Sequence, residues 1–196
     1  MTEPRLPALS APQGESLALE LGLPARTGAL LAFRVIANHP GLAKGIFTQH
    51  MAVRHQGSLP ERQRELLIMR VAWRAGSAYE WSQHWRIATN AGVPPEQLER
   101  VRQWQDTDCF SATDRAVLQA VDDVFDHGEV MPESWERCSS ALGSPLLALE
   151  TVVAIVHWHG LAVLFSSLSI PLEPGETPWP PDGRSPAGRR QGTRQA

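Results

Sequence analysis

The same signals for starting and ending a helix recur along the whole chain. A capping residue or a proline is followed by apolar residues at helical spacing and then by a glycine, while no segment alternates as a strand would. This pattern predicts an all-α fold with about eight helices and short loops. The predicted helices run from Thr27 to residue 38, over 42–55, 58–75, 77–92, 94–104, 111–128 and 132–143, and from Ser144 to about residue 165.

The length of the chain favours one domain with ragged ends. Its 196 residues, 42% of them hydrophobic, are enough to form a core. Residues 1–26 contain four prolines and little periodicity, so we expect an N-terminal arm there. The helical domain then covers residues 27–172. Residues 173–196 are rich in proline, glycine and arginine, which predicts a disordered tail.

The most apolar stretch is PLLALETVVAIVHWHGLAVLF, residues 145–165, which contains Glu150, His157 and His159. A charged side chain at the centre of a bilayer costs about 2.5–3.5 kcal/mol. We therefore interpret the stretch as the central helix of a soluble core or of a subunit interface, and expect no membrane partner. Glu150 and His157 share a helix face, which predicts a hydrogen bond. His157 and His159 diverge on a helix, so they cannot bind one metal ion together.

Charge argues against nucleic acid as a partner. The charged residues that follow Asp182 are all arginines, namely Arg184, Arg189, Arg190 and Arg194. The rest of the chain is therefore more acidic than the formal net charge of −3 indicates. It lacks the basic excess needed to follow a phosphate backbone.

The termini and the cysteines predict a cytoplasmic protein without a metal site. The first residues carry Glu3 and several prolines but no continuous apolar run, so we expect neither a secretory signal nor a transit peptide. Cys109 and Cys138 lie far apart and form no CxxC pair. This spacing favours two reduced thiols over a disulfide or a zinc site.

Glu65 is the first candidate for acid–base chemistry. Its helical neighbours at i+3, i+4 and i+7 are Ile68, Met69 and Ala72, so its carboxylate points at the core or at a cleft. Burial raises the pKa of a carboxyl group toward neutrality, which suits a general acid or base at pH 7. A structural role, in which Glu65 pairs with a buried arginine or caps a helix, explains the position equally well.

The segment GSAYEWSQH places Ser77, Glu80 and His84 on one face of a helix. Ser77 and Glu80 fit a capping box, in which the serine oxygen accepts the N–H of Glu80 and the carboxylate accepts the N–H of Ser77. That is a sufficient structural reason for Glu80. His84 follows one turn later, and a carboxylate at that spacing can orient an imidazole and raise its pKa. The segment therefore also predicts an acid–base pair.

The run LPERQRELLIMRVAWRAGSAYEWSQHWRIATNAGVPPEQLERV, residues 59–101, resembles the carboxymuconolactone decarboxylase family of the alkyl hydroperoxidase D-like superfamily. NHP before the second helix, FSATDRAVLQAVDD and LETVVAIVHWHGLAVLFSSLSIPLEP extend the resemblance to about residues 28–174. The resemblance implies an all-α fold whose helical hairpins associate into homo-oligomers, trimers or hexamers, with pockets near subunit boundaries.

In the thiol peroxidase branch of that superfamily, the site is a glutamate, then a CxxC pair, then a histidine. By this resemblance Glu65 matches the glutamate and His84 the histidine. Ser77 and Glu80 stand where the cysteines would be, with Tyr79 between them. Peroxide reduction in that branch needs a thiolate nucleophile and a resolving thiol. We therefore expect no thiol peroxidase activity of that type.

The resemblance instead implies cofactor-free acid–base chemistry on a small carboxylated lactone or keto acid, like the decarboxylation for which the family is named. The expected catalytic residues are Glu65, Tyr79, Glu80 and His84. His84 or Tyr79 would donate to the enolate left by loss of CO₂, and Glu65 or Glu80 would hold the histidine tautomer. Two alternatives stay open. One is a peroxidase that uses Cys109 or Cys138, and the other is a non-catalytic oligomeric binder of small hydrophobic acids.

Overall fold

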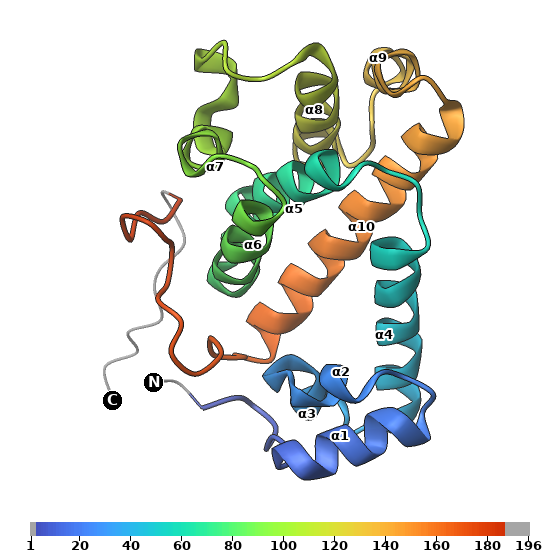
Figure 1. Ribbon diagram of the computed structural model, residues 1–196, viewed down its shortest axis with the longest axis vertical. Helices are drawn as coiled ribbons and strands as arrows, with labels where there is room; N and C mark the ends of the chain where they lie inside the picture. Colours follow the sequence, from blue (N-terminus) through green and yellow to red (C-terminus); the bar gives the residue numbers. More distant parts are fainter. Residues whose placement is uncertain (1–2, 187–196) are drawn as a thin grey trace.

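The structure, a computed structural model, describes residues 3–186. In that part it consists of ten α-helices and one 3₁₀ helix, and contains no strand (Figure 1), which confirms the all-α prediction. The elements are α1 (Ala11–Glu20), α2 (Ala25–Ala29), α3 (Leu31–Ile36), α4 (Pro40–His55), α5 (Glu61–Ala75), α6 (Ala78–Asn90), α7 (Pro95–Arg100), η1 (Val101–Asp106), α8 (Ala112–His127), α9 (Pro132–Leu142) and α10 (Pro145–Ser167).

Most helix boundaries follow the local signals in the sequence. Ser111 and Asp114 form a complete capping box at the start of α8, each side chain accepting the backbone N–H of the other residue. Gly76 ends α5 in the left-handed conformation, with φ of 65°, which a glycine adopts without steric cost. The chain then turns sharply at Ser77, and α6 packs beside α5.

The predicted helix from Thr27 to residue 38 is wrong as a single element. Leu30 has extended backbone angles, so the segment divides into α2 and α3 (Figure 1), and Thr27 lies inside α2 instead of capping it. The break has a tertiary cause. Gly28 lies so close to Gly14 of α1 that a Cβ on Gly28 would meet the Gly14 carbonyl oxygen at 2.2 Å. Bringing α2 this close to α1 fixes its direction independently of α3.

The N-terminal arm expected over residues 1–26 is also wrong in part. Residues 11–20 form α1, which begins with a capping box between Ser10 and Gln13. Ala18 is fully buried against the rest of the protein. The sequence carried the capping signal, but the apolar face of α1 is too short to be recognised without its packing partner.

The tail expected from residue 173 onward is ordered as far as the structure describes it. Trp179 is 5% exposed, and its ring lies 5.9 Å from that of Trp81 in α6. The indole N–H of Trp81 donates to the carbonyl oxygen of Pro180 at 2.8 Å. The burial of Trp179 and the hydrogen bond from Trp81 thus help to attach a segment whose composition indicated disorder. Residues 187–196 of the predicted tail lie outside the described residues.

Helix α10 runs diagonally through the middle of the molecule (Figure 1) and packs against α4, α5, α6, α8 and α9. Within residues 3–186 it is the one helix long and apolar enough to cross a membrane by length and composition. Its Ala154, Ile155 and Trp158 are buried in the hydrophobic core. This packing agrees with the interpretation of the stretch as a central core helix.

The predicted pairing of Glu150 with His157 is wrong. Glu150 Oε2 accepts the backbone N–H groups of Ser58 and Leu59, both at 2.7 Å, just before α5 begins. His157 instead contacts His50 of α4, with 3.2 Å between Nε2 and Nδ1. The two residues therefore have separate partners, because the loop before α5 packs over Glu150 and α4 packs over His157.

One face of α10 is left uncovered. Its exposed large apolar residues recur at spacings of three, four, three and seven, the pattern of a helix that packs on another helix. The exposed members are Leu146 (68%), Leu149 (50%), Val153 (37%), Val156 (57%) and Val163 (49%). A stripe of this kind favours association between copies of the chain, as the resemblance implies.

We predict that wild-type protein is oligomeric at micromolar concentration and that the double substitution Leu149→Glu/Val156→Asp yields monomers, because charges would then have to be buried at the contact. Light scattering after size-exclusion chromatography measures both masses. Leu19→Glu, on an exposed leucine of α1, is the matched control and should leave the mass unchanged. A monomeric wild-type protein contradicts the prediction.

We also predict that Trp179→Ala lowers the free energy of unfolding by about 3–5 kcal/mol, the usual cost of truncating a buried aromatic side chain. Urea denaturation followed by circular dichroism measures the change. Arg184→Ala, a few residues further on and mostly exposed, should change stability by less than about 0.5 kcal/mol. Equal effects of the two substitutions would mean that Trp179 does not hold the segment in place.

Candidate functional site

The α5–α6 hairpin brings Glu65 and His84 into direct contact. Glu65 is fully buried on α5, and its Oε2 lies 2.7 Å from Nδ1 of His84, which is 4% exposed on α6. The distance is that of a strong hydrogen bond. The shared position expected for the two residues from sequence is therefore present in the fold.

Trp158 of α10 fixes the tautomer of His84. Its indole N–H can only donate, and it lies 3.2 Å from Nε2 of His84. Nε2 is consequently an acceptor, so the ring proton is on Nδ1 and is donated to Glu65. The sequence left open whether Glu65 or Glu80 holds the histidine tautomer, and these contacts give that position to Glu65.

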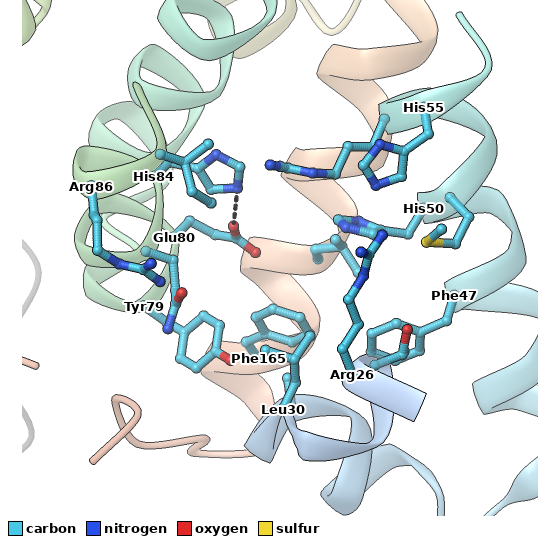
Figure 2. A pocket seen from close by; sticks show the side chains of 17 residues that line it. Arg26, Leu30, Phe47, His50, His55, Tyr79, Glu80, His84, Arg86 and Phe165 are labelled. Atoms are coloured by element: carbon cyan, nitrogen blue, oxygen red, sulfur yellow. Dashed lines mark ion pairs between the residues drawn. The ribbon is translucent and has the colours of Figure 1, made fainter. Parts of the chain in front are cut away.

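Glu80 has only half of the predicted capping box. Its backbone N–H donates to Ser77 Oγ at 3.3 Å, but its carboxylate does not return to the N–H of Ser77, which donates to the carbonyl oxygen of Ala72. The carboxylate turns toward His84 instead, with Oε2 at 3.6 Å from Nε2 (Figure 2). The capping-box explanation of the Glu80 side chain is therefore wrong, because a buried imidazole is within its reach.

The two carboxyl groups differ in their protonation. Burial raises the pKa of Glu80 to about 7, against the opposing effects of His84 and Arg54. Burial also acts to raise the pKa of Glu65, but the hydrogen bond with His84 and the positive charges of Arg54 and Arg64 outweigh it, so that this pKa is lowered. Glu65 is thus a carboxylate at neutral pH, while Glu80 exchanges a proton near pH 7.

Glu80 and His84 line a cavity of about 540 Å³ between α2, α4, α6 and α10 (Figure 2). Glu80 Oε1 is buried and has no hydrogen-bond partner within residues 3–186. Apolar side chains, among them Phe47, Leu161 and Phe165, form much of the remaining wall. An unpaired carboxyl oxygen beside an apolar cavity is an arrangement found where a small ligand binds.

Three arginines of this cavity were missed by the sequence analysis. Arg26 and Arg86 are exposed residues of the lining, and Arg54 is less exposed, with its guanidinium 3.9 Å from Glu65 Oε1. Arg54 had a readable signal, because Phe47, His50 and Arg54 share one face of α4. Arg26 and Arg86 had none, since only the tertiary fold brings them to the same cavity.

Tyr79 contributes its ring to the cavity but not its hydroxyl group. The hydroxyl donates to Glu173 Oε1 at 2.7 Å, and the same oxygen accepts the backbone N–H of Leu31. Burial and the neighbouring Glu173 carboxylate raise the pKa of Tyr79. Tyr79 is therefore bound to the segment after α10 and is not directed at His84.

Neither cysteine lines this cavity. Cys109 is exposed in the loop before α8, and Cys138 is buried on α9, where its thiol donates to the carbonyl oxygen of Ala116. Burial raises the pKa of the Cys138 thiol to about 11, so it is protonated and unreactive near neutral pH. Among residues 3–186 no group of histidine, cysteine and acidic side chains is arranged to hold a metal ion.

The segment from α4 to α8 that carries the site matches a known family. Residues 40–123 match the carboxymuconolactone decarboxylase family. No curated protein matches the chain in sequence.

Solved structures share the fold of the chain at low sequence identity. A peroxidase-related protein from Ralstonia eutropha, described as an alkylhydroperoxidase AhpD core, has a TM-score of 0.71 and 14% identity, over 89% of this chain and 94% of its own. A putative antioxidant defence protein AhpD from Agrobacterium tumefaciens has a TM-score of 0.64 and 17% identity, over 69% and 93%. The debrominase Bmp8 has a TM-score of 0.68 and 18% identity, over 85% and 91%. The chain therefore has an AhpD-like fold.

We predict that Glu80 gives the stability of the protein a pH dependence of definite sign. Its pKa is about 7 when folded and 4.5 in the reference state, so between these values the folded protein keeps a proton that the unfolded chain has lost. The resulting stability is fully present below pH 4.5 and is lost as the pH rises through 7. Glu80→Gln mimics the protonated acid and should gain stability relative to wild type by up to roughly 1.4 kcal/mol per pH unit in this range.

Urea unfolding of both proteins at pH 5, 6 and 7 measures this difference. The comparison cancels the effects of His50 and His157, whose lowered pKa values act with the opposite sign. Glu129→Gln, on an exposed residue, is the control and should show no such trend. A constant difference between wild type and Glu80→Gln would mean that Glu80 is ionised throughout.

Proposed function

We propose that the protein is a cofactor-free acid–base enzyme, a decarboxylase or a related lyase or isomerase, that acts on a small carboxylated lactone or keto acid. The observation that carries the proposal is Glu80, a buried carboxyl group with a pKa of about 7 and an unpaired oxygen, next to His84 in the wall of a cavity. An acid or base whose pKa is close to the working pH transfers protons most effectively.

In the proposed decarboxylation, the bond between the substrate carbon and its carboxylate breaks and CO₂ leaves. The electron pair remains as an enolate, and the protonated carboxyl group of Glu80 then gives its proton to the carbon. Glu80 takes up another proton from solvent before the next turnover. For an isomerisation, the Glu80 carboxylate first removes a proton from carbon and then returns it to a different carbon. Neither sequence requires an oxidant or a reductant.

His84 and Glu65 support proton transfer by Glu80. Glu65 accepts a hydrogen bond from the Nδ1–H of His84, so Nε2 is the unprotonated ring nitrogen. Nε2 accepts the indole N–H of Trp158 and lies 3.6 Å from Oε2 of Glu80. A proton that passes from Glu80 to Nε2 would replace the hydrogen bond from Trp158 and convert His84 into a cation, and the Glu65 carboxylate stabilises that cation through their hydrogen bond. Glu65 is fully buried, so we assign it the role of orienting His84.

The arginines support a substrate that carries a carboxylate. Arg26, Arg54 and Arg86 come from three different helices and line the same cavity, to which Glu80 brings a carboxyl group that is only partly ionised at neutral pH. A guanidinium group pairs with a carboxylate through two parallel hydrogen bonds. One such contact would position the substrate, while the apolar wall accommodates its carbon skeleton.

The two alternative functions have less support. A thiol peroxidase would need a reactive cysteine at the cavity, and the lining contains none. A binder without catalytic activity would be compatible with a fully paired polar network, but the buried Glu80 Oε1 lacks a hydrogen-bond partner in the described part of the chain. Buried acceptors that remain unpaired cost stability, which favours a functional reason for them.

We further propose that the enzyme works in the cytoplasm as a homo-oligomer, a trimer or a hexamer, without a nucleic-acid or membrane partner. Helix α10 buries one face in the core and leaves a stripe of apolar residues exposed, and this stripe supports association between copies of the chain.

A thermal-shift screen of small carboxylic acids, keto acids and lactones is the direct test of the substrate class. We expect stabilisation by carboxylated compounds and less by their methyl esters, because the ester cannot pair with the arginines. Each compound that binds is then incubated with the enzyme, and CO₂ release or exchange of solvent deuterium into carbon is measured. Binding of the esters as tightly as the acids would argue against recognition of a carboxylate.

We predict that His84→Gln and Glu80→Gln each reduce turnover of the substrate found in this way by about 10²–10⁴-fold, the usual contribution of a positioned acid or base. Ser77→Ala is the matched control on the same helix, where loss of the cap should cost about 1 kcal/mol of stability with little change in turnover. Full activity of both the His84 and the Glu80 variant would exclude the proposed chemistry.

A further inference from the structure

His50 faces the cavity from the opposite side to Glu80 and His84. It belongs to α4, while the other two belong to α6 (Figure 2). The rings of His50 and His84 both pack on Trp158 of α10, with centroid distances of 5.6 and 5.8 Å. The indole thus holds the two imidazoles on either side of the same cavity.

One nitrogen of His50 is occupied and the other is available. Nδ1 lies 3.2 Å from Nε2 of His157, a buried residue of α10. Nε2 of His50 has no hydrogen-bond partner within residues 3–186. Because His50 lines the cavity, this nitrogen is the one that a ligand can reach.

The surroundings of His50 keep its ring neutral. The titratable and charged groups near it are His157 from α10, His84 from α6, and Arg54 and His55 from its own helix. All of them oppose a further positive charge. Burial, reinforced by these neighbours, lowers the pKa of His50 to about 3, and burial lowers that of His157 to about 4.

We propose that His50 is a second catalytic residue, whose Nε2–H donates a hydrogen bond to the substrate oxygen that becomes the enolate oxygen, and that His157 is a positioning residue that donates its own Nε2–H to Nδ1 of His50. This proposal rests on the proposed acid–base function. It extends that function by assigning the stabilisation of the enolate to a residue across the cavity from Glu80 and His84.

The assignment follows because the residues on the two sides of the cavity have different tasks in the proposed reaction. Glu80 gives or takes the proton at carbon, so it cannot also serve the oxygen on the other side of the substrate. A neutral imidazole with a lowered pKa suits that second task, because it polarises a carbonyl group without giving up its proton. When the electron pair moves onto the oxygen, the hydrogen bond from His50 becomes charge-assisted and therefore stronger. No proton leaves His50, and the overall balance of the reaction is unchanged.

The tautomer of His50 tests the proposal without any substrate. Proton–nitrogen NMR correlation spectra of the full-length protein show which ring nitrogen carries the proton. We expect the proton of His50 on Nε2 and a neutral ring between pH 5 and 8. A proton on Nδ1, or a ring that becomes charged in this range, would overturn the proposal. In His157→Phe, which removes the donor but keeps a ring of similar size, the proton should distribute over both nitrogens.

Oxalate, a planar dianion that resembles an enolised keto acid, is the probe for binding. Calorimetry should give a dissociation constant for His50→Ala about tenfold or more above that of wild type, the usual loss when a hydrogen bond to a charged group is removed. His50→Gln should stay within about threefold, because its amide keeps an N–H close to the position of Nε2. His127→Gln, on an exposed histidine of α8, is the control. Equal binding by wild type and His50→Ala, or no binding by wild type, contradicts the proposal.

Kinetics separate this proposal from the proposed function. On the substrate found by screening, His50→Ala should lower kcat by about 10²–10³-fold with a smaller change in KM, as the loss of an oxyanion donor does. His157→Phe should lower kcat less, and His50→Gln should restore much of it. If His84→Gln and Glu80→Gln abolish turnover while His50→Ala does not, the acid–base function stands and the role of His50 is refuted. If the α6 variants are fully active, the function itself is wrong.

Discussion

The contact between Glu65 and His84 is the interaction on which the site depends. Complete burial of a carboxylate costs folding free energy, and this cost is offset only when positive charges or hydrogen-bond donors surround the carboxylate. His84 supplies a hydrogen bond at 2.7 Å, and two arginines lie within 4 Å of the other oxygen. With Nδ1 of His84 committed in this way, Nε2 is left toward Glu80. Glu65 therefore determines which ring nitrogen of His84 lies next to Glu80.

Helix α10 links this site to the core. Its apolar residues pack against α5 and α8 in the core. Two of its polar aromatic side chains hydrogen-bond a histidine of the cavity, Trp158 with His84 and His157 with His50. A substitution in α10 that repacks the core would thus also move His50 or His84. This arrangement explains how the most apolar helix of the chain serves both stability and the geometry of a polar site.

Side-chain contacts hold the segment after α10 against the α5–α6 hairpin. Glu173 accepts from Tyr79 and from the first residue of α3, and Asp182 pairs with Arg102, whose guanidinium lies over the rings of Trp73 and Trp81. None of these pairs is close in sequence. They give the C-terminal segment a fixed position, although its composition resembles that of a flexible linker.

The sequence by itself determined the helices and three members of the site. Capping residues, glycines and apolar spacing are local signals, so they predicted α4 to α6 and α8 to α10 closely, whereas the helix expected over 94–104 divides into α7 and η1. The same local signals predicted that Glu80 and His84 share a helix face and that Glu65 lies on a buried stripe. The resemblance to the family added the correspondence between Glu65 and His84. Phe47, His50 and Arg54 carry a similar signal on α4, but they form part of no recognised motif.

Only the tertiary structure decided the partners of these residues. The carboxylate of Glu80 satisfied a capping pattern in the sequence, yet it faces His84 instead, because α5 and α10 bury both side chains in the same place. The division of the helix after Thr27, the pairing of His157 with His50 and the attachment of Trp179 have the same origin. Each depends on a contact between segments far apart in the chain, and the free energy of such a contact does not exist until the fold has brought the segments together.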